Sequence, residues 1–186
     1  MKLYTIIGGV NGTGKSSLTG VLRAERNDLG IIIDVDKLNA FLGGKMAGGK
    51  AAAKKISDCI EMGISFTQET TLSGKRTLKT ARLAKERGYM IRLYYVALDS
   101  LQESLARIQN RVARGGHSIP AADVTRRFAT RFDDVARILP YTDEAVFYSN
   151  ENGFQAVAEY KNGELFLLQD NPPDWAKKLQ EFLQFH

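Results

Sequence analysis

The sequence predicts an α/β fold in three layers (α/β/α), with helices on both faces of a mainly parallel, five-stranded sheet. Short apolar, β-branched segments alternate with segments of helical periodicity along the 186 residues, which is typical of parallel strand-helix-strand units. Apolar residues make up 44% of the chain, enough for one substantial core. We therefore expect a single domain over residues 1–186.

The predicted elements follow one another in a regular order. Strands are expected at 3–7, 31–33, 64–69, 90–98 and 145–149, and helices at 15–26, 50–62 and 75–87. Two arginine-rich helices, 101–114 and 121–138, predict a helical lid region over 101–138, with Ser100 as the cap of the first helix and Glu103 as its capping-box partner. The region 144–186 is predicted to contain a strand, a hairpin with an Asn162-Gly163 turn, and a helix from Asp174.

The composition indicates the cellular compartment of the protein but does not identify the molecule that it binds. With 26 Lys and Arg against 21 Asp and Glu, the net charge is +5, which suits anionic small molecules and nucleic acids alike. The single cysteine, Cys59, is expected to pack in a helix, as in a reducing cytoplasm. The first apolar run is too short for a signal peptide, and no run approaches the roughly 18 apolar residues of a membrane span. We expect a cytoplasmic protein that does not enter a membrane.

A glycine-rich segment stands between the first predicted strand and the first predicted helix. Residues 9–16 read Gly-Val-Asn-Gly-Thr-Gly-Lys-Ser and match the pattern G-x-x-x-x-G-K-[ST] at every fixed position. In this context the pattern predicts a P-loop NTPase, because backbone N–H groups converge on phosphate oxygens at a helix N-terminus. The alternative is a glycine-rich turn that binds nothing. The expected nucleotide contacts are Gly9, Asn11, Gly12, Thr13, Gly14, Lys15, Ser16 and Ser17.

Within this loop, two side chains have distinct expected roles. Lys15 is expected to reach the β- and γ-phosphates of ATP and to act in catalysis, and the Ser16 hydroxyl is expected to bind Mg²⁺. The chain has no N-K-x-D guanine motif, no D-x-x-G switch motif after a strand, and no long apolar strand ending in Asp-Glu. GTPases and many motor ATPases are thereby disfavoured, which leaves a kinase of a small acceptor.

Two carboxylates follow the second predicted strand, at the sheet edge where parallel sheets place their ligands. Asp36 is the candidate general base, which could accept the proton of an acceptor hydroxyl or hold a Mg²⁺-bound water. The alternative is that Asp34 and Asp36 cap the following helix, a role that suits Asp34 better.

A second polar cluster, Glu69 to Lys75, ends the third predicted strand at the same edge. Glu69 and Thr71 are the candidate acceptor contacts, because a carboxylate and hydroxyls hydrogen-bond sugar or other polyol groups. The alternative is that Thr71 and Ser73 only cap the next helix.

Arginines dominate the predicted lid. Arg107, Arg111 and Arg114 share one helix face, and Arg126, Arg127 and Arg131 follow across a Gly115-Gly116 hinge. Such a hairpin could bring arginines to the transferred phosphate, and we expect Arg114 and Arg127 there in preference to Arg111 and Arg126. The alternative is a solvated basic face. His117, in the hinge, is expected to form loop hydrogen bonds.

Taken together, these segments resemble the zeta toxin family of P-loop kinases over about residues 3–150. The resemblance rests on four segments: Gly-Val-Asn-Gly-Thr-Gly-Lys-Ser-Ser at 9–17, Ile-Asp-Val-Asp at 33–36, Glu-Thr-Thr-Leu-Ser-Gly at 69–74 and Arg-Val-Ala-Arg-Gly-Gly-His-Ser-Ile-Pro at 111–120. It implies ATP as the phosphoryl donor and a catalytic aspartate at Asp36. It also implies acceptor contacts at Glu69 and Thr71, with phosphate-binding arginines at Arg114 and at Arg126 or Arg127.

The resemblance also suggests an acceptor and a protein partner. Well-known family members phosphorylate a sugar hydroxyl of UDP-N-acetylglucosamine, and an antitoxin blocks their nucleotide site. UDP-N-acetylglucosamine or a related sugar nucleotide is thus the expected acceptor, and any antitoxin is expected to be a separate protein. At Ser73 the chain lacks a basic acceptor contact that the family has, so another metabolite or an antibiotic is the alternative acceptor.

A nucleotide-binding switch or nucleic-acid-associated ATPase is the alternative from another functional class. The basic balance and the arginine hairpin favour it. Single-strand binders, however, display aromatic side chains beside basic ones, whereas Tyr94, Tyr95, Phe128 and Phe132 stand at positions expected to be buried. We therefore expect a small-molecule acceptor rather than a nucleic acid.

Overall fold

The structure is a computed structural model that describes residues 1–41, 45–116 and 118–185. Within these ranges the side chains of residues 36, 39, 40, 45 and 46 are not described. The expectations for the Asp36 side chain and for His117 therefore lie outside the described part of the chain.

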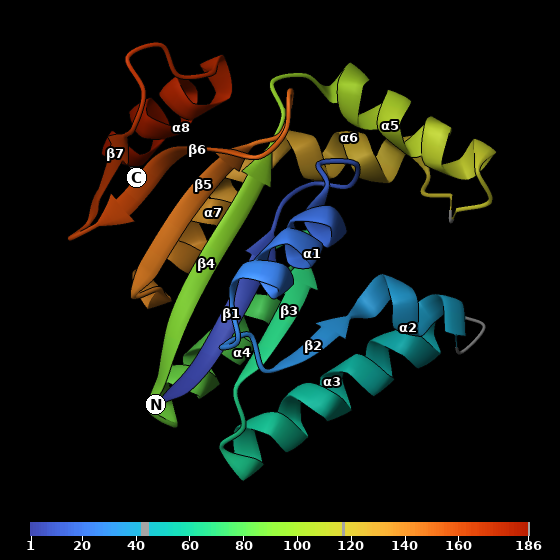
Figure 1. The fold of residues 1–186 in the computed structure, drawn as a ribbon, viewed down its shortest axis with the longest axis vertical. Coiled ribbons are helices and arrows are strands. Elements are labelled where there is room, and N and C mark those ends of the chain that lie inside the picture. The colour runs from blue at the N-terminus through green and yellow to red at the C-terminus, as the bar shows by residue number, and fades with distance from the viewer. Residues whose placement is uncertain (42–44, 117, 186) are drawn as a thin grey trace.

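One twisted sheet forms the centre of the molecule, with the strand order β2-β3-β1-β4-β5-β6-β7 (Figure 1). Strands β1 to β5 pair with one another in parallel, and β6 and β7 extend the sheet beyond β5 in antiparallel pairing. The strand bounds are β1 (Lys2–Gly8), β2 (Ile31–Asp34), β3 (Phe66–Thr70), β4 (Tyr89–Ala97), β5 (Glu144–Ser149), β6 (Gln155–Lys161) and β7 (Glu164–Leu167). The five predicted parallel strands are confirmed, but the sheet has seven strands because the predicted hairpin extends it.

Helices cover the two faces unequally (Figure 1). On one face α1 packs against Ile7, Tyr94 and Val96 of the sheet. The opposite face carries the larger core, to which α3, α4, α7 and α8 contribute. The helix bounds are α1 (Lys15–Glu25), α2 (Val35–Phe41), α3 (Lys45–Met62), α4 (Arg76–Glu86), α5 (Leu101–Ala113), α6 (Ala121–Ala129), α7 (Arg131–Ile138) and α8 (Asp174–Gln184), with a 3-10 turn at Leu139–Tyr141.

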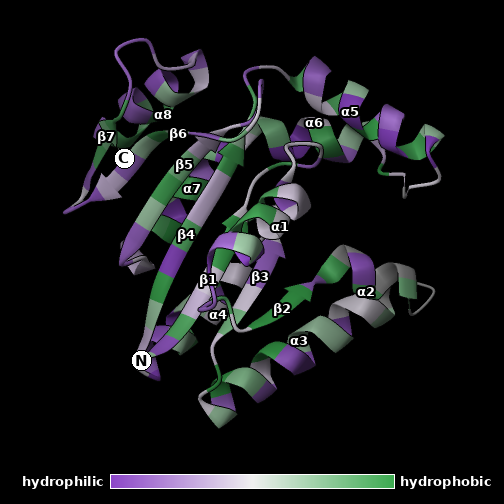
Figure 2. Ribbon diagram, viewed as in Figure 1, coloured by the Kyte–Doolittle hydropathy of each residue, from purple (hydrophilic) through white to green (hydrophobic). Residues whose placement is uncertain are grey.

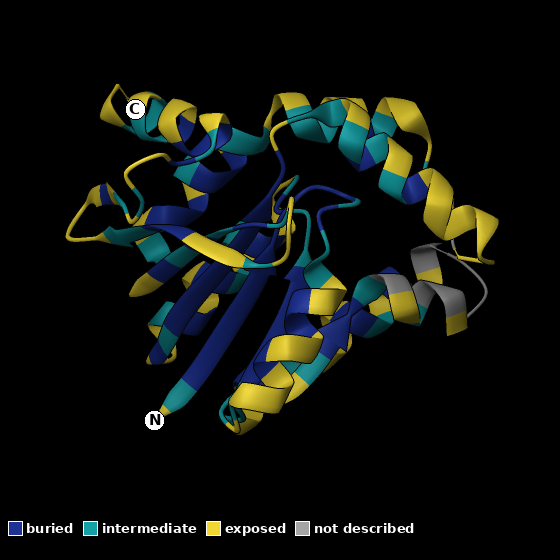
Figure 3. Ribbon diagram, turned by 45° about the horizontal axis from the view of Figure 1, so that its top comes forward, coloured by how far each residue is buried: buried dark blue, intermediate teal, exposed yellow. Residues whose placement is uncertain are grey.

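The core follows from the sequence pattern. Strands β1 and β4 have neighbours on both sides and helices over both faces, so nearly all their side chains are buried, and their sequences are almost continuously apolar (Figures 2 and 3). Helices α5 to α8 are amphipathic and expose their polar faces. Cys59 packs in the larger core, as predicted, and burial raises the pKa of its thiol.

Local signals were accurate at several boundaries. Ser100 caps α5 by accepting a hydrogen bond from the Glu103 N–H at 3.1 Å, while the Glu103 carboxylate pairs with Arg107 instead of closing a capping box. The β6–β7 turn has Asn162 and Gly163 at φ of 54° and 87°, as an Asn-Gly hairpin requires.

The helix predicted at 121–138 is in fact two helices, α6 and α7, that meet at Thr130. The break lets the chain turn from the lid back onto the sheet. None of the described helices combines the length and the apolar character needed to cross a membrane.

Candidate active site

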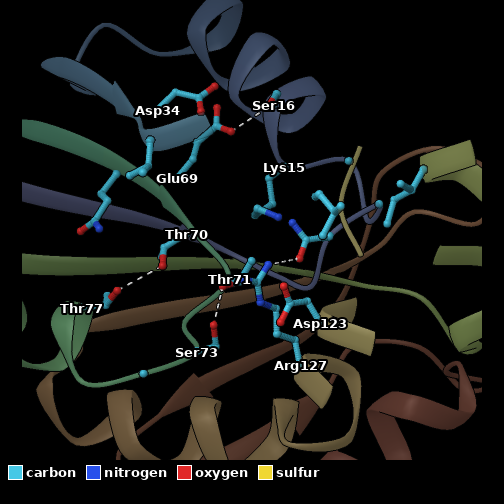
Figure 4. Close-up of a pocket in the computed structure, with 18 of the residues that line it drawn as sticks. Lys15, Ser16, Asp34, Glu69, Thr70, Thr71, Ser73, Thr77, Asp123 and Arg127 are labelled. Atoms are coloured by element: carbon cyan, nitrogen blue, oxygen red, sulfur yellow. Dashed lines mark hydrogen bonds between the residues drawn. The ribbon is translucent and has the colours of Figure 1, made fainter. Parts of the chain in front are cut away.

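A cavity of about 660 Å³ opens at the C-terminal ends of β1, β2 and β3 (Figure 4). Parallel sheets place their ligand sites at this edge, and the helix that follows each strand starts there. Four segments contribute to its wall: the loop before α1, the start of α2, the β3–α4 loop, and the helices α5 and α6 with the segment between them.

The loop between β1 and α1 has the backbone that its glycines permit. Gly9, Gly12 and Gly14 have φ of 147°, 86° and 100°, values that side chains other than glycine rarely adopt. Lys15 Nζ folds over the loop and donates to the carbonyls of Gly9 and Val10 at 2.9 and 3.1 Å. These contacts hold the ammonium group at the centre of the loop, where a phosphate-binding lysine is needed.

The lid helices are docked on this loop. A Cβ at Gly12 would lie 2.5 Å from the Ser104 carbonyl oxygen of α5, so only glycine allows this approach. Val10 packs in a small core with Ile108 of α5 and Val124 of α6. The base of the arginine hairpin is thus fixed to the loop by packing.

Ser16 and Glu69 meet at the start of α1. Ser16 Oγ donates to Glu69 Oε2 at 2.7 Å (Figure 4). Thr19 Oγ1 donates to Glu69 Oε1 at 2.6 Å. Glu69 is 6% exposed, so these two hydroxyl groups replace much of its hydration. The hydroxyl expected to bind Mg²⁺ therefore touches the carboxylate that the sequence assigned to the acceptor.

Arg127 reaches the loop from α6. Its Nη1 donates to Asn11 Oδ1 at 2.6 Å, while its Nε is buried without a hydrogen-bond partner in the described structure. Asn11 is itself only 4% exposed. An arginine held this way has donor capacity left for an anion on the loop.

The other arginines divide into two groups. Arg107 and Arg111 line the cavity, and Arg107 also donates to Glu103 and to the Asn150 carbonyl, each at 2.6 Å. Arg114 and Arg126 are exposed and are absent from the described residues of the cavity wall. Arg114 lines a separate hollow beside Arg111, and Arg126 pairs with Asp123. Among the described residues, the structure thus brings Arg127 to the loop and Arg111 to the cavity wall, and places Arg114 and Arg126 at neither.

Asn150 is a contact that the sequence did not predict. Asn150 follows β5, and its side-chain Nδ2 donates to the Thr13 carbonyl at 2.8 Å. The backbone carbonyl of Asn150 accepts a hydrogen bond from the Arg107 guanidinium. A Cβ at Gly14 would lie 2.3 Å from Asn150 Nδ2. Asn150 therefore braces the loop against α5, and only its place at the end of a predicted parallel strand could have indicated it.

The β3–α4 loop presents hydroxyl groups to the cavity. Leu72 has a φ of 60° and is buried, close to where a Cβ of Gly8 would lie. Thr71 and Ser73, on either side of it, line the cavity and hydrogen-bond each other at 2.8 Å. Thr70 bonds Thr77 of α4 at 3.1 Å, so neither Thr71 nor Ser73 is needed to tie the loop to that helix.

Asp34 has the structural role that the sequence favoured for it. Its Oδ1 accepts from the Lys37 N–H at 3.1 Å at the start of α2, and its Oδ2 lies 3.5 Å from Lys37 Nζ. Asp36 is in the first turn of the same helix, directly after β2, at the edge where the cavity opens. The role of its side chain stays a prediction.

The comparison with known families decides the assignment. The zeta toxin family model matches residues 2–153, most of the chain. The chain belongs to the zeta toxin family.

Relatives agree with this membership. An uncharacterized protein of Haemophilus influenzae is 34% identical over 125 residues, which are 63% of this chain and 86% of that protein. A structure from the PezAT chromosomal toxin-antitoxin system of Streptococcus pneumoniae superposes with a TM-score of 0.67 at 15% identity, covering 100% of this chain and 85% of that one. The AvrRxo1-ORF1:-ORF2 complex with ATP gives 0.71 at 17% identity, covering 98% of this chain but 63% of that one. This chain therefore spans less than two thirds of the AvrRxo1 chain, and both likenesses support the fold.

Most of the residues that are predicted to contact the nucleotide line the cavity. Gly9 and Thr13 are the exceptions on the loop: they do not line the cavity, and Thr13 Oγ1 instead bonds the Val10 carbonyl. Tyr94 and Tyr95 are buried in the sheet, as predicted. The prediction is wrong for Phe128 and Phe132, which are only half-buried because both rings lie against the Arg131 guanidinium near the surface. These aromatic side chains are therefore occupied in packing.

Proposed function

We propose that the chain is an ATP- and Mg²⁺-dependent phosphotransferase that moves the γ-phosphoryl group of ATP to a hydroxyl of a small acceptor. One observation carries the proposal: a single cavity joins the Lys15 loop, the Ser16–Glu69 pair, the polar β3–α4 loop and Arg127. A non-enzymatic nucleotide switch has no need of the hydroxyl-lined part of this wall. Membership of the zeta toxin family and the ATP complex of AvrRxo1 support ATP as the donor.

The residues present fit the expected donor and metal. Ser16 and Glu69 offer oxygen ligands of the kind that Mg²⁺ prefers, and the unpartnered Arg127 Nε suits an anion at the loop. When bound, Mg²⁺ would neutralise charge on the β- and γ-phosphates. We assign Glu69 to the cation side of the site rather than to the acceptor, because its two oxygens are bound by Ser16 and Thr19.

The transfer itself needs a base and positively charged groups. The acceptor oxygen forms a bond to the γ-phosphorus, its proton passes to the Asp36 carboxylate, and the bond to the β–γ bridging oxygen breaks, so that ADP leaves. Lys15 and Arg127 stabilise the charge on the transferred group, with Arg111 as a further candidate beside them. Asp36 has this role by its place after β2 and by the family likeness.

The acceptor is best tested by mass spectrometry. Incubation with ATP, Mg²⁺ and a panel that includes UDP-N-acetylglucosamine, other sugar nucleotides and antibiotics should give one product that is heavier by one phosphoryl group. UDP-N-acetylglucosamine is our first candidate, because family members use it. ATP hydrolysis stimulated by DNA or RNA, with no modified small molecule, would refute the kinase assignment.

Two variants test the assigned chemistry. Asp36→Asn should lower acceptor-dependent turnover by about 10²- to 10⁴-fold while ATP binding persists, because only the base is lost. Lys15→Ala should lower both turnover and ATP affinity. Asp58→Asn is the matched control, since it removes a surface carboxylate of α3 that pairs with Lys54. Full turnover in Asp36→Asn would show that another group is the base.

We also propose that any antitoxin is a separate protein. The PezAT structure comes from a toxin-antitoxin system, and AvrRxo1-ORF1:-ORF2 is a complex of two different chains, which supports a partner supplied by another chain. A protein encoded beside this one should reduce binding of a fluorescent ATP analogue when the two are mixed. Unchanged analogue binding in the presence of a partner that demonstrably binds would contradict a block of the nucleotide site.

A further inference from the structure

Gln68 is a buried polar side chain of the cavity wall that the chemistry described above does not use. It is 3% exposed and stands in β3 directly before Glu69, and both residues line the cavity. Successive side chains of a strand point to opposite faces of the sheet. Because Glu69 points to the face of α1, where it meets Ser16, Gln68 points to the opposite face, which carries the larger core. Gln68 therefore reaches the cavity from the side away from the proposed cation site.

The oxygen of the Gln68 amide is held by a tyrosine of this core. Tyr4 donates from its hydroxyl to Gln68 Oε1 at 2.5 Å, and its fully buried ring stacks on Phe66 with 4.5 Å between the ring centroids. Burial raises the pKa of the Tyr4 phenol well above its usual range, so the group keeps its proton and remains a donor. A donating hydroxyl requires the oxygen of the amide, so this bond also turns the amide nitrogen away from Tyr4.

The nitrogen of the same amide is open to the cavity. Gln68 Nε2 forms no hydrogen bond with the described part of the chain, yet it is not sealed from solvent. The cavity is the opening that Gln68 lines, so the nitrogen reaches solvent there. Polar atoms of such buried side chains are nearly always hydrogen-bonded, and one left without an acceptor is costly. The amide is therefore placed to donate to a molecule in the cavity.

The surroundings of this nitrogen favour a carbonyl oxygen as its partner. Thr70 follows on the same face, where its hydroxyl bonds Thr77 Oγ1 at 3.1 Å and accepts from the Leu72 N–H (Figure 4). These hydroxyl groups are thus already engaged with one another. A ligand hydroxyl beside Gln68 would need a second partner for its own proton, whereas a carbonyl oxygen needs only the donor.

We propose that Gln68 is a specificity-determining residue that selects phosphoryl acceptors by donating a hydrogen bond from Nε2 to a carbonyl oxygen of the acceptor. Tyr4 is the positioning residue, which acts through Gln68 and does not touch the acceptor. The inference rests on the proposed kinase function and deepens it, because it names a group that the acceptor must bear. Sugar nucleotides carry such oxygens in their nucleobase and in N-acetyl groups.

Binding to the protein with a filled donor site tests the proposal. The protein is saturated with adenosine 5′-(β,γ-imido)triphosphate and Mg²⁺ and then titrated by calorimetry with UDP-N-acetylglucosamine. Gln68→Met keeps the length of the side chain but removes the donor, so it should weaken this binding by about 10- to 100-fold. Glucose 1-phosphate, which has hydroxyl groups but no carbonyl, should show equal affinity for the unaltered protein and for Gln68→Met. Affinity for the nucleotide analogue should not change.

Two tyrosines of the same core provide a matched pair of variants. Tyr4→Phe should weaken binding of UDP-N-acetylglucosamine by about 3- to 10-fold, because the Gln68 amide is then no longer held in place before binding. Tyr89→Phe removes a buried hydroxyl that bonds the Cys59 and Ile64 carbonyls, outside the described cavity wall, and should change the affinity by less than twofold. In the Gln68→Met background, Tyr4→Phe should have no further effect on affinity, because it acts only through the amide.

The outcomes separate this inference from the function on which it rests. The inference is overturned if Gln68→Met binds UDP-N-acetylglucosamine within twofold of the unaltered protein, or if it loses affinity for glucose 1-phosphate to the same extent. Equal effects of Tyr4→Phe and Tyr89→Phe, or no binding of UDP-N-acetylglucosamine to the loaded protein, would overturn it as well. Phosphoryl transfer to another compound would leave the kinase assignment standing in each of these cases. Failure of the analogue itself to bind would instead refute the kinase assignment.

Discussion

Arg126 and Arg127 are adjacent in the chain but have opposite surroundings. Arg127 is half-buried and donates to Asn11 on the phosphate-binding loop, whereas Arg126 is exposed and pairs with Asp123. Sequence spacing cannot separate them, since both belong to one arginine-rich helix. The orientation of α6 decides which of the two arginines contacts the loop.

This contrast gives a test within a single helix. Arg127→Ala should lower kcat by about 10²- to 10³-fold, because in the proposed mechanism this side chain stabilises the charge on the transferred group. Arg126→Ala should stay within about twofold of the unaltered protein, since exposed ion pairs contribute little. Steady-state kinetics with the acceptor found by mass spectrometry measures both. Equal losses in the two variants would mean that the helix acts only through its overall charge.

Glu69 and Thr71 can be separated in the same way. Glu69→Gln should raise the Mg²⁺ concentration needed for half-maximal activity by about 10- to 100-fold, because it removes a carboxylate from the proposed cation site and weakens the contact to Ser16. Thr71→Ala should leave the Mg²⁺ dependence unchanged and raise the KM for the acceptor. Activity measured over a range of Mg²⁺ concentrations at saturating ATP distinguishes the two roles. If Glu69→Gln changed only the acceptor KM, the original acceptor assignment of Glu69 would be correct.

At the scale of elements, the phosphate-binding loop depends on its contact with α5. Gly12 has a φ of 86°, which residues other than glycine rarely adopt, and a Cβ there would lie 2.5 Å from the Ser104 carbonyl oxygen. Both the backbone conformation and the lack of space therefore disfavour a side chain at this position. Gly20, in α1, has nothing within 4 Å of its Cβ position. These two glycines of neighbouring segments therefore differ in whether the structure needs them.

Substitution by alanine should have opposite effects at the two sites. Gly12→Ala should weaken binding of the ATP analogue by at least about 10-fold, because either the loop or α5 must move. Gly20→Ala should raise stability by about 0.5–1 kcal/mol, since glycine inside a helix is unfavourable, and should leave activity intact. Thermal unfolding and analogue titration test both. Normal analogue affinity in Gly12→Ala would show that the docking of α5 on the loop is dispensable.

The order of elements could be predicted from the sequence because each depends on local signals. The β-branched runs, the glycine loop, Ser100 and the Asn162-Gly163 turn all act within a few residues. The contacts that assemble the site do not: Ser16 meets Glu69 across 53 residues, and Asn150 meets Thr13 across 137. Such pairings depend on strand order and helix docking.

At the scale of the whole molecule, one network of ion pairs lies away from the cavity. Arg92, in the first half of β4, is 6% exposed and pairs with Glu144 at 2.8 Å and with Asp28 at 3.1 Å. Arg26 joins Asp28 at 2.7 Å. This network connects the end of α1, β4 and the start of β5, so it stabilises the sheet without contributing a group to the site.

The network predicts a specific loss of stability in acid. Hydrogen bonds from Arg26 and then from Arg92 hold the pKa of the Asp28 carboxyl well below its usual range. Because the folded protein binds this proton less readily than the unfolded chain, the contribution of Asp28 is complete above about pH 4–5 and is lost as the pH falls through the lower folded pKa. Asp28→Asn should therefore reduce stability at pH 7, by about 1 kcal/mol, since Asp28 is 38% exposed and solvent screens the pair.

Urea unfolding of Asp28→Asn and of the unaltered protein at a series of pH values measures this effect. The difference in unfolding free energy should be largest near neutral pH and should shrink below about pH 4, where the unfolded carboxyl takes up its proton. Asp58→Asn, which removes an exposed carboxylate paired with Lys54 within α3, should show a smaller difference at neutral pH. Phosphoryl transfer by Asp28→Asn at 25 °C should be normal. A difference that persisted unchanged into acid would mean that Asp28 stabilises the sheet by packing rather than by its charge.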